Sequence, residues 1–184
     1  MGHRSGEADT LHNLGAVYSR QGSHQQAAEH HQQALILFRE IGGRAGEAYA
    51  LGDLGVVYRQ QGHYRRAAEH DQQALALFRE IGHRHGEATA LNGVGETHHA
   101  TGHHDQARVH HNAALTLATK IGERYEQARA HNGLAHTHHA TGDPDQARHH
   151  WCQALALYAD LGVPEAGDVH AHLTALDQAT GDDD

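Results

Sequence analysis

The sequence predicts an all-α protein, an α-solenoid built from successive helix–turn–helix units. Three observations predict this fold: a repeat of 40 residues, a composition rich in helix-forming residues, and glycines at regular intervals. The segments 6–45 and 46–85 are identical at 25 of 40 positions without a gap. Periods of about 20–50 residues are typical of repeat arrays, whose units bury their apolar faces against one another.

The chain divides into repeat units, a final helix and an acidic tail. We expect the units to span 6–45, 46–85, 86–125 and 126–164. The segment 165–180 is predicted to be a capping helix that covers the apolar face of the last unit. The segment 181–184 is predicted to be a solvated acidic tail. No matching cap precedes the first unit, so the outer face of its first helix is either polar or docks on another surface.

Each unit is predicted to contain two helices separated by a glycine. In the first unit the opening helix has an inward-facing stripe with helical spacing, formed by Ala8, Leu11, Leu14, Gly15 and Tyr18. Gly22 follows this helix at a position suited to a C-cap. The second helix ends at Gly42, and its inward-facing stripe is Ala27, His31, Ala34, Leu35, Phe38 and Ile41.

Two helix starts carry capping signals. Ser23 and Gln26 have the spacing of a capping box, in which each side chain bonds to the backbone of the other residue. In the fourth unit Asp143 is the predicted N-cap, Pro144 the first helical residue and Gln146 the partner of the cap. Aromatic residues make up only 5% of the chain, so the helices must pack mainly through small side chains.

The recurring residues resemble the tetratricopeptide repeat. Its pattern places a large residue, Leu, a small residue and Tyr on the first helix, and Ala, an aromatic residue and Ala on the second. The first unit fills these positions with Leu11, Leu14, Gly15, Tyr18, Ala27, His31 and Ala34. The 40-residue period is similar to the Leu-Gly-Asn spindle-orientation adaptors and to the C-terminal arrays of actinobacterial transcriptional regulators and signalling ATPases. The resemblance implies a right-handed superhelix whose first helices line a concave groove for a peptide or partner domain.

Under this resemblance, the groove is lined by polar residues on the first helices, opposite the apolar stripe. The predicted partner-binding residues are Asp9, His12, Asn13, Tyr49, Asp53, Arg59, Asn92, Glu96, His99, Arg129, Asn132, His136 and His139. We expect the two arginines to grip carboxylates or backbone of the partner. The adaptor family commonly has a second Asn two residues after the Leu, but this chain has Ala16, Val56, Glu96 and His136 there. The adaptors' peptide specificity is therefore not carried over, and the alternative is that these residues are only a solvated face.

Histidine is unusually abundant, with 23 copies, many of them adjacent to one another. Glu96 and His99 on one first helix and His136 and His139 on the next occupy equivalent positions, so they are the candidate ligands for Zn²⁺ or Ni²⁺. The competing interpretation is that the histidines are polar helix positions or core residues, as for His98 and His138, which replace tyrosines. A pH-responsive protein is a related alternative, because histidine titrates near neutrality.

Composition and charge exclude several other classes of function. The formal net charge of −9 argues against nucleic acid. No stretch approaches the roughly 20 apolar residues of a membrane span, and the first residues lack the apolar core of a signal peptide. The single cysteine, Cys152, excludes an internal disulfide and is predicted to be a buried, inert thiol next to the core residue Trp151. A cytoplasmic location is the expectation.

Motifs of catalysis are missing from the sequence: it has no phosphate-binding glycine loop, no nucleophile elbow and no metalloprotease motif. We therefore predict a protein–protein interaction module, not an enzyme, with no cofactor and with a protein or peptide partner. Two alternatives stay open: a histidine-rich metal-binding or pH-responsive protein, and a protein that self-associates through its end repeats.

Overall fold

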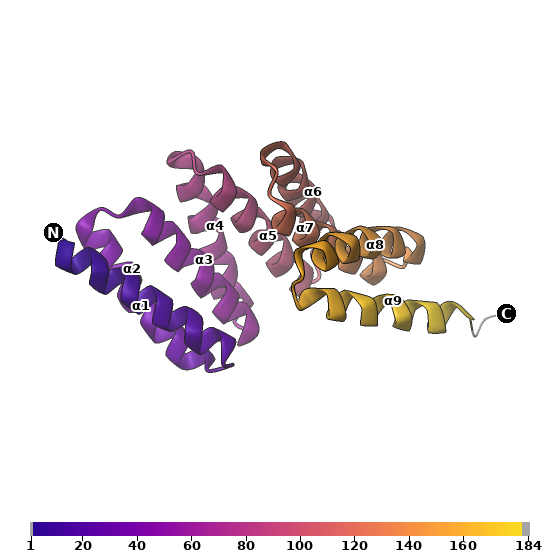
Figure 1. Ribbon diagram of the computed structural model, residues 1–184, viewed down its shortest axis with the longest axis horizontal. Coiled ribbons are helices and arrows are strands. Elements are labelled where there is room, and N and C mark those ends of the chain that lie inside the picture. The colour runs from indigo at the N-terminus through magenta and orange to yellow at the C-terminus, as the bar shows by residue number, and fades with distance from the viewer. Residues whose placement is uncertain (1, 182–184) are drawn as a thin grey trace.

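The structure is a computed structural model that describes residues 2–181, and this part of the chain contains helices and no strands (Figure 1). The helices are α1 (Gly2–Arg20), α2 (His24–Ile41), α3 (Arg44–Gln60), α4 (Tyr64–Glu80), α5 (Arg84–Ala100), α6 (His104–Ile121), α7 (Arg124–Ala140), α8 (Pro144–Leu161) and α9 (Glu165–Gly181). The predicted all-α solenoid is confirmed. Helix α9 takes in Gly181 of the predicted acidic tail, and residues 182–184 lie outside the described residues.

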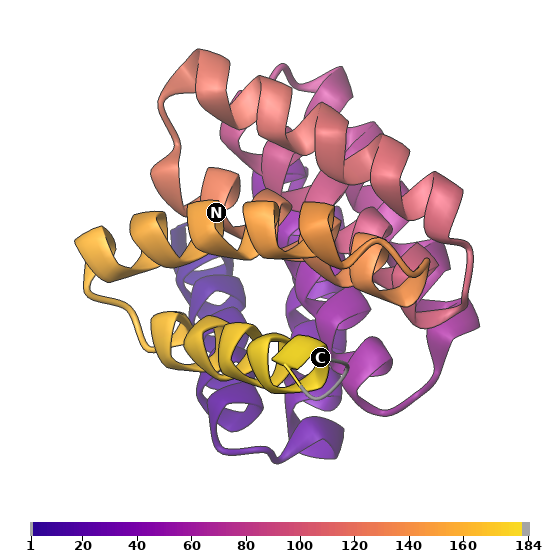
Figure 2. The same cartoon turned by 90° about the vertical axis from the view of Figure 1, so that its right-hand side faces the viewer.

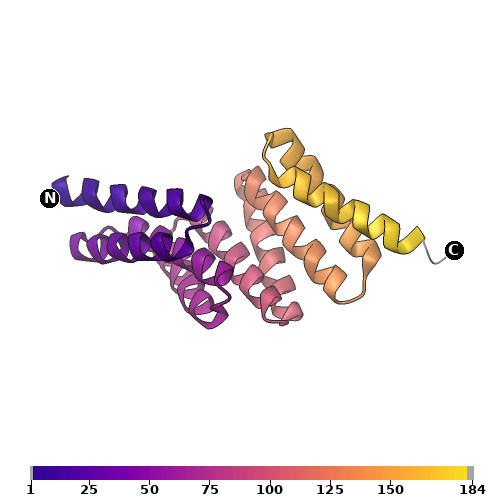
Figure 3. The same cartoon turned by 90° about the horizontal axis from the view of Figure 1, so that it is seen from below.

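Successive helix pairs stack into an elongated, curved array. Each helix packs against its neighbours in the chain, and the first helices α1, α3, α5 and α7 also contact one another in order. The first helices therefore form a continuous inner layer. The array begins with α1 and α2 at one end and finishes with α9 at the other (Figure 3). Viewed from the C-terminal end, the pairs turn about the long axis, with α8 and α9 nearest the viewer (Figure 2).

Turns that contain a glycine join the helices, and backbone hydrogen bonds stabilise these turns. All eight turn glycines have a positive φ between 67° and 77°, the left-handed conformation that costs glycine least. At the first turn the N–H of Gly22 donates to Ser19 O at 3.0 Å, and the N–H of Ser23 donates to Tyr18 O at 2.9 Å. This pair of bonds is a Schellman motif, and the same pair recurs at the later turns.

The two capping predictions have different outcomes. The capping box at Ser23 is wrong, because the Ser23 side chain makes no cap bond. The Schellman turn already fixes this helix start. At α8 the predicted N-cap and the place of the proline are confirmed: Asp143 Oδ1 accepts from the Gln146 N–H at 3.1 Å, with Pro144 at the start of the helix.

The last helix, α9, packs on α8 at the end of the array. Trp151 of α8 is 2% exposed, and its ring stacks on His172 of α9 with the ring centres 5.3 Å apart. Val169 and Leu176 of α9 are buried in the same apolar cluster. Cys152, by contrast, is exposed, so the prediction of a buried thiol is wrong. One residue after Trp151 on a helix, its side chain points away from the buried face.

The outer face of α1 is partly apolar. Leu14 is 40% exposed and Val17 is 37% exposed, whereas the equivalent Leu54 and Val57 of α3 are 0% and 1% exposed. The interior helices are covered by the preceding unit, and no described element covers α1 in this way. The expectation that Leu14 faces inward is therefore wrong.

None of the helices in the described part of the chain is long and apolar enough to cross a membrane.

Candidate functional site

A cavity of about 320 Å³ opens on the inner layer, between α3, α5 and α7. Its walls include Tyr49, Asp53, Val56 and Arg59 of α3, Glu96 of α5, and Tyr125 and Arg129 of α7, with Asp71 and Phe78 of α4 behind them. First helices supply most of this lining because they are the helices that pack side by side. The cavity thus lies on the layer that the first helices form.

The structure brings five of the predicted partner-binding residues into this cavity: Tyr49, Asp53, Arg59, Glu96 and Arg129. Asp9 and Asn13 lie on α1 outside it, and both are exposed. His12 lies on α1 with its Nε2 atom 2.7 Å from Asp53 Oδ2. The other five predicted residues lie towards the C-terminal half of the inner layer.

Arg59 is the centre of an internal ion-pair network. Its guanidinium donates to Asp71 Oδ2 at 3.0 Å, to Glu96 Oε2 at 2.7 Å and to Thr97 Oγ1 at 2.8 Å. Asp71 is 2% exposed, and Thr97 donates to its carboxylate at 2.7 Å. Burial raises the pKa of Asp71, although Arg59 and Thr97 oppose that shift.

Arg129 holds the other side of Glu96 in a two-bond pair. Its Nε donates to Oε1 at 2.6 Å, and one terminal nitrogen donates to Oε2 at 2.9 Å. Desolvation by itself raises the pKa of Glu96, but Arg129 and Arg59 outweigh it and lower the pKa to about 2. Because both guanidiniums are bound to carboxylates of the chain itself, neither presents a free positive charge to a partner.

Asn92 does not reach the groove surface. It is 0% exposed, and its amide donates to Glu126 O at 3.1 Å and to Glu126 Oε2 at 2.9 Å. Its Oδ1 lies 3.2 Å from Nδ1 of the buried His111. Burial lowers the pKa of His111 to about 4, so this imidazole is neutral at neutral pH. Asn92 therefore joins α5, α6 and α7 and does not line the cavity.

The remaining predicted residues surround Trp151. Asn132 accepts a bond from Trp151 Nε1 at 3.2 Å, and the rings of His136 and His139 lie 5.4 Å and 5.5 Å from the indole, centre to centre. His99 lies 5.9 Å from His136 between ring centres. These side chains pack against the aromatic core of the last unit and do not extend the cavity.

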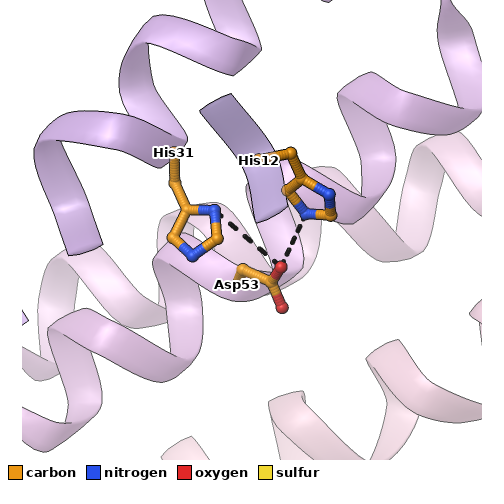
Figure 4. Close-up of side chains that lie close together, drawn as sticks. All are labelled: His12, His31 and Asp53. Atoms are coloured by element: carbon orange, nitrogen blue, oxygen red, sulfur yellow. Dashed lines mark hydrogen bonds and ion pairs between the residues drawn. The ribbon is translucent and has the colours of Figure 1, made fainter. Parts of the chain in front are cut away.

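The candidate metal ligands Glu96, His99, His136 and His139 are not gathered around one point. Glu96 forms ion pairs with Arg59 and Arg129, and the His139 ring packs against the ring of Trp151. Among the described residues, the group of three or more ligand-type side chains that does come together is His12, His31 and Asp53, with ligand atoms within 4.8 Å of one another (Figure 4).

Five residues of these networks were not predicted as site residues: His31, Asp71, Thr97, His111 and Glu126. His31 lies on the inward-facing stripe predicted for the second helix, at the aromatic position of the repeat, and Asp71 is at the equivalent position of the next unit. A polar residue in a buried aromatic position was the signal that could have found them. The signal for Glu126 was its place in the repeat, where the second and third units have Gly46 and Gly86.

Comparison with known proteins agrees with this architecture. The family model described as tetratricopeptide repeat matches residues 6–80 and 81–160, while no curated protein matches the chain. Among solved structures, a Rap protein complexed with competence and sporulation factor has a TM-score of 0.88 and 19% identity, over 96% of this chain and 50% of that one. The chain thus spans half the length of the Rap protein.

Two further structures extend the comparison. BtubC from P. vanneervenii has a TM-score of 0.78 and 19% identity, over 97% of this chain and 75% of that one. A putative kinesin light chain from Podosopora anserina with TPR-like repeats has a TM-score of 0.73 and 19% identity, over 99% and 90%. Similarity at this level of identity establishes the fold, and the family model covers most of the chain. The protein belongs to the tetratricopeptide repeat family.

Proposed function

We propose that this protein is a non-catalytic interaction module that binds a peptide segment of a partner protein in the cavity between α3, α5 and α7. The observation that carries the proposal is the cavity itself, an opening of about 320 Å³ on the inner layer, walled by aromatic and aliphatic side chains over fixed charges. A preformed groove binds at low entropic cost, because its lining is ordered before the partner arrives. The Rap structure, which holds competence and sporulation factor, supports a comparable use of this fold.

The chemistry of the cavity favours an apolar anchor. Tyr49, Val56 and Tyr125 offer apolar surface, and Tyr125 is 39% exposed. Arg59 and Arg129 are already paired, so their role is to fix the shape and polarity of the wall. We infer that an aliphatic or aromatic side chain of the partner enters the cavity, and that partner N–H groups bond to acceptors such as Asp53 at its rim.

The setting of this interaction is part of the proposal. The net charge of −9 argues against a nucleic-acid partner, and the single cysteine fits a reducing, cytoplasmic compartment. The resemblance to the arrays of actinobacterial regulators supports a role in bacterial regulation or signalling.

Gly52→Arg is the variant that tests the groove. Gly52 lines the cavity, and a Cβ at this position would meet nothing within 4 Å. The substitution therefore fills the groove without disturbing the fold. Gly167→Arg is the matched control, since Gly167 lies in α9 with equally open surroundings and away from the cavity.

Proteins captured from the native cell extract with the parent chain are identified, and the purified partner is then titrated against both variants. We expect Gly52→Arg to weaken binding more than about tenfold, a loss of about 1.4 kcal/mol, and Gly167→Arg to bind as the parent does. Equal binding by all three chains would contradict the use of this groove.

Self-association through the first unit is the second candidate, and the exposed Leu14 and Val17 favour it. Adjacent apolar side chains that are buried in the interior units are a suitable surface for a second copy of the chain. Light scattering over a range of concentrations measures the mass. We expect Leu14→Gln/Val17→Gln to abolish any concentration dependence and Ile36→Gln, at a 56% exposed position of α2, to leave it unchanged. A constant monomer mass for the parent would exclude this candidate.

A further inference from the structure

Three side chains from three helices meet at the junction of the first and second units (Figure 4). His12 comes from α1, His31 from α2 and Asp53 from α3. His12 Nε2 lies 2.7 Å from Asp53 Oδ2, and His31 Nδ1 lies 3.9 Å from the same oxygen. Both imidazoles thus turn a ring nitrogen towards one carboxylate.

His31 has a buried ring nitrogen without a hydrogen-bond partner at this junction. The side chain is 1% exposed, and its Nδ1 atom is buried without a hydrogen-bond partner in the chain. A buried polar atom that lacks a partner costs about 1–3 kcal/mol. The atom faces Asp53 at a separation too long for a hydrogen bond, so the junction has room for a ligand between them.

We propose that His12, His31 and Asp53 bind one divalent transition-metal ion, with Zn²⁺ as the best fit. Two imidazole nitrogens and one carboxylate oxygen form a donor set that Zn²⁺ accepts, with a fourth position left for water. Tetrahedral ligands at about 2.0–2.1 Å from zinc lie about 3.3 Å from each other. The two measured separations, 2.7 Å and 3.9 Å, lie on either side of this value.

The two ligands that must change position to coordinate one ion have side chains with room to do so. The His12 side chain is 23% exposed and the Asp53 side chain 42% exposed, so both can rotate, while the buried His31 is held by its surroundings. A cavity of about 150 Å³ adjoins His31 and Asp53 and is also lined by Ala16, Ser19, Arg20 and Val56. It offers a route for the ion and space for its water.

The other unit junctions show why the site is confined to the first. The residues equivalent to His12, His31 and Asp53 are Gly52, Asp71 and Gly93 at the second junction and Asn92, His111 and Gly133 at the third. Glycine replaces the carboxylate in both. His111 is as buried as His31 and its Nε2 also lacks a partner, but its Nδ1 lies 3.2 Å from Asn92 Oδ1, and no carboxylate faces it from the next first helix. The histidine-rich composition alone therefore does not create this arrangement.

The ion would join both helices of the first unit to the second unit. Any ligand that binds only the folded chain raises its stability. Zn²⁺ is therefore expected to raise the melting temperature, and a chelator to reverse the increase.

The test is a calorimetric Zn²⁺ titration of the full chain, with a crystal of the zinc-soaked protein examined for anomalous density at the zinc edge. His12→Gln and Asp53→Asn remove ligands from partly exposed positions, so neither leaves a buried void. His99→Gln/His139→Gln is the matched control, because it removes two histidines elsewhere on the inner layer. Circular dichroism checks that each variant is folded.

We expect one tight site per parent chain and a loss of affinity of more than about tenfold in each ligand variant. The control should retain the parent's affinity, and Asp53→Glu should retain part of it. The anomalous peak should lie between the three side chains. The same affinity in the parent and both ligand variants, a loss in the control, or density for water only would overturn the proposal.

Discussion

Gly46 and Gly86 each lie where an aromatic ring fills the space of a missing side chain. The ring of Phe38 occupies the Cβ position of Gly46, and the ring of Phe78 occupies that of Gly86. At the end of the third unit Ala118 replaces Phe38 and Phe78, and Glu126, the first residue of the fourth unit, replaces the glycine. No ring fills the space beside Glu126, so its carboxylate can be buried next to Asn92.

Gly46→Ala tests this packing at the scale of one residue. The added methyl group overlaps the Phe38 ring, so we expect a loss of about 1–3 kcal/mol in the free energy of unfolding. Gly52→Ala is the control, because its Cβ would meet nothing within 4 Å and alanine stabilises a helix interior by about 0.5–1 kcal/mol. Urea denaturation measures both. Equal effects of the two substitutions would show that Phe38 simply moves aside.

The contacts between helices depend on polar networks as well as on apolar packing. Arg59 of α3 and Arg129 of α7 converge on Glu96 of α5, so one carboxylate connects three successive first helices. The Arg59 and Arg129 side chains are 13% and 18% exposed, and that of Glu96 is 30% exposed. Partly buried, two-bond pairs of this kind are stronger than ion pairs in water.

Removing one member of this network should lower the free energy of unfolding far more than removing one member of an exposed ion pair. We expect Arg129→Ala to lower the free energy of unfolding by about 2–4 kcal/mol, because it leaves the buried side of Glu96 unpaired. The control is Arg65→Ala, since Arg65 and Glu69 form a 3.6 Å pair with side chains 92% and 55% exposed, where the cost should be below about 0.5 kcal/mol. A double-mutant cycle with Glu96→Gln isolates the pairwise coupling. A coupling near zero would contradict a role for this pair in joining the helices.

Over the whole molecule, buried histidines tie stability to pH. Burial lowers the pKa of His111, His136 and His150 to about 4 in each case, compared with about 6.5 in an unfolded chain. Between these values the unfolded state binds more protons than the folded state. Stability is therefore complete above about pH 6.5 and falls as the pH drops towards 4. The sequence offered a pH-responsive protein as an alternative because histidine titrates near neutrality, and the structure adds burial as a cause.

We expect the free energy of unfolding to fall by about 1 kcal/mol between pH 7.5 and 5.5 from His111 alone. Urea denaturation at several pH values, with a chelator present, measures the change. His111→Gln should reduce the pH dependence, and substitution of the exposed His170 should leave it unchanged. A free energy that is constant across this range would contradict the prediction.

The sequence by itself determined the helices and their order. The 40-residue period, the turn glycines and the small residues on facing helices are local signals, repeated four times, and each was sufficient without knowledge of distant contacts. The resemblance to the tetratricopeptide repeat implied the inner layer and put Tyr49, Asp53, Arg59, Glu96 and Arg129 on it. The sequence could not show that Arg59 and Arg129 are paired, because their partners lie 12 to 37 residues away.

Tertiary structure decided which side chains meet between units. The stacking of one unit on the next sets Asp53 of α3 against His31 of α2, and it sets glycines against the equivalent positions of the later units. The same stacking covers Leu54 and leaves Leu14 exposed, although both occupy the same position of the repeat. A repeat pattern shows only what the equivalent positions of the units have in common. The candidate sites are formed by residues that differ between units, and these residues meet only because the units stack.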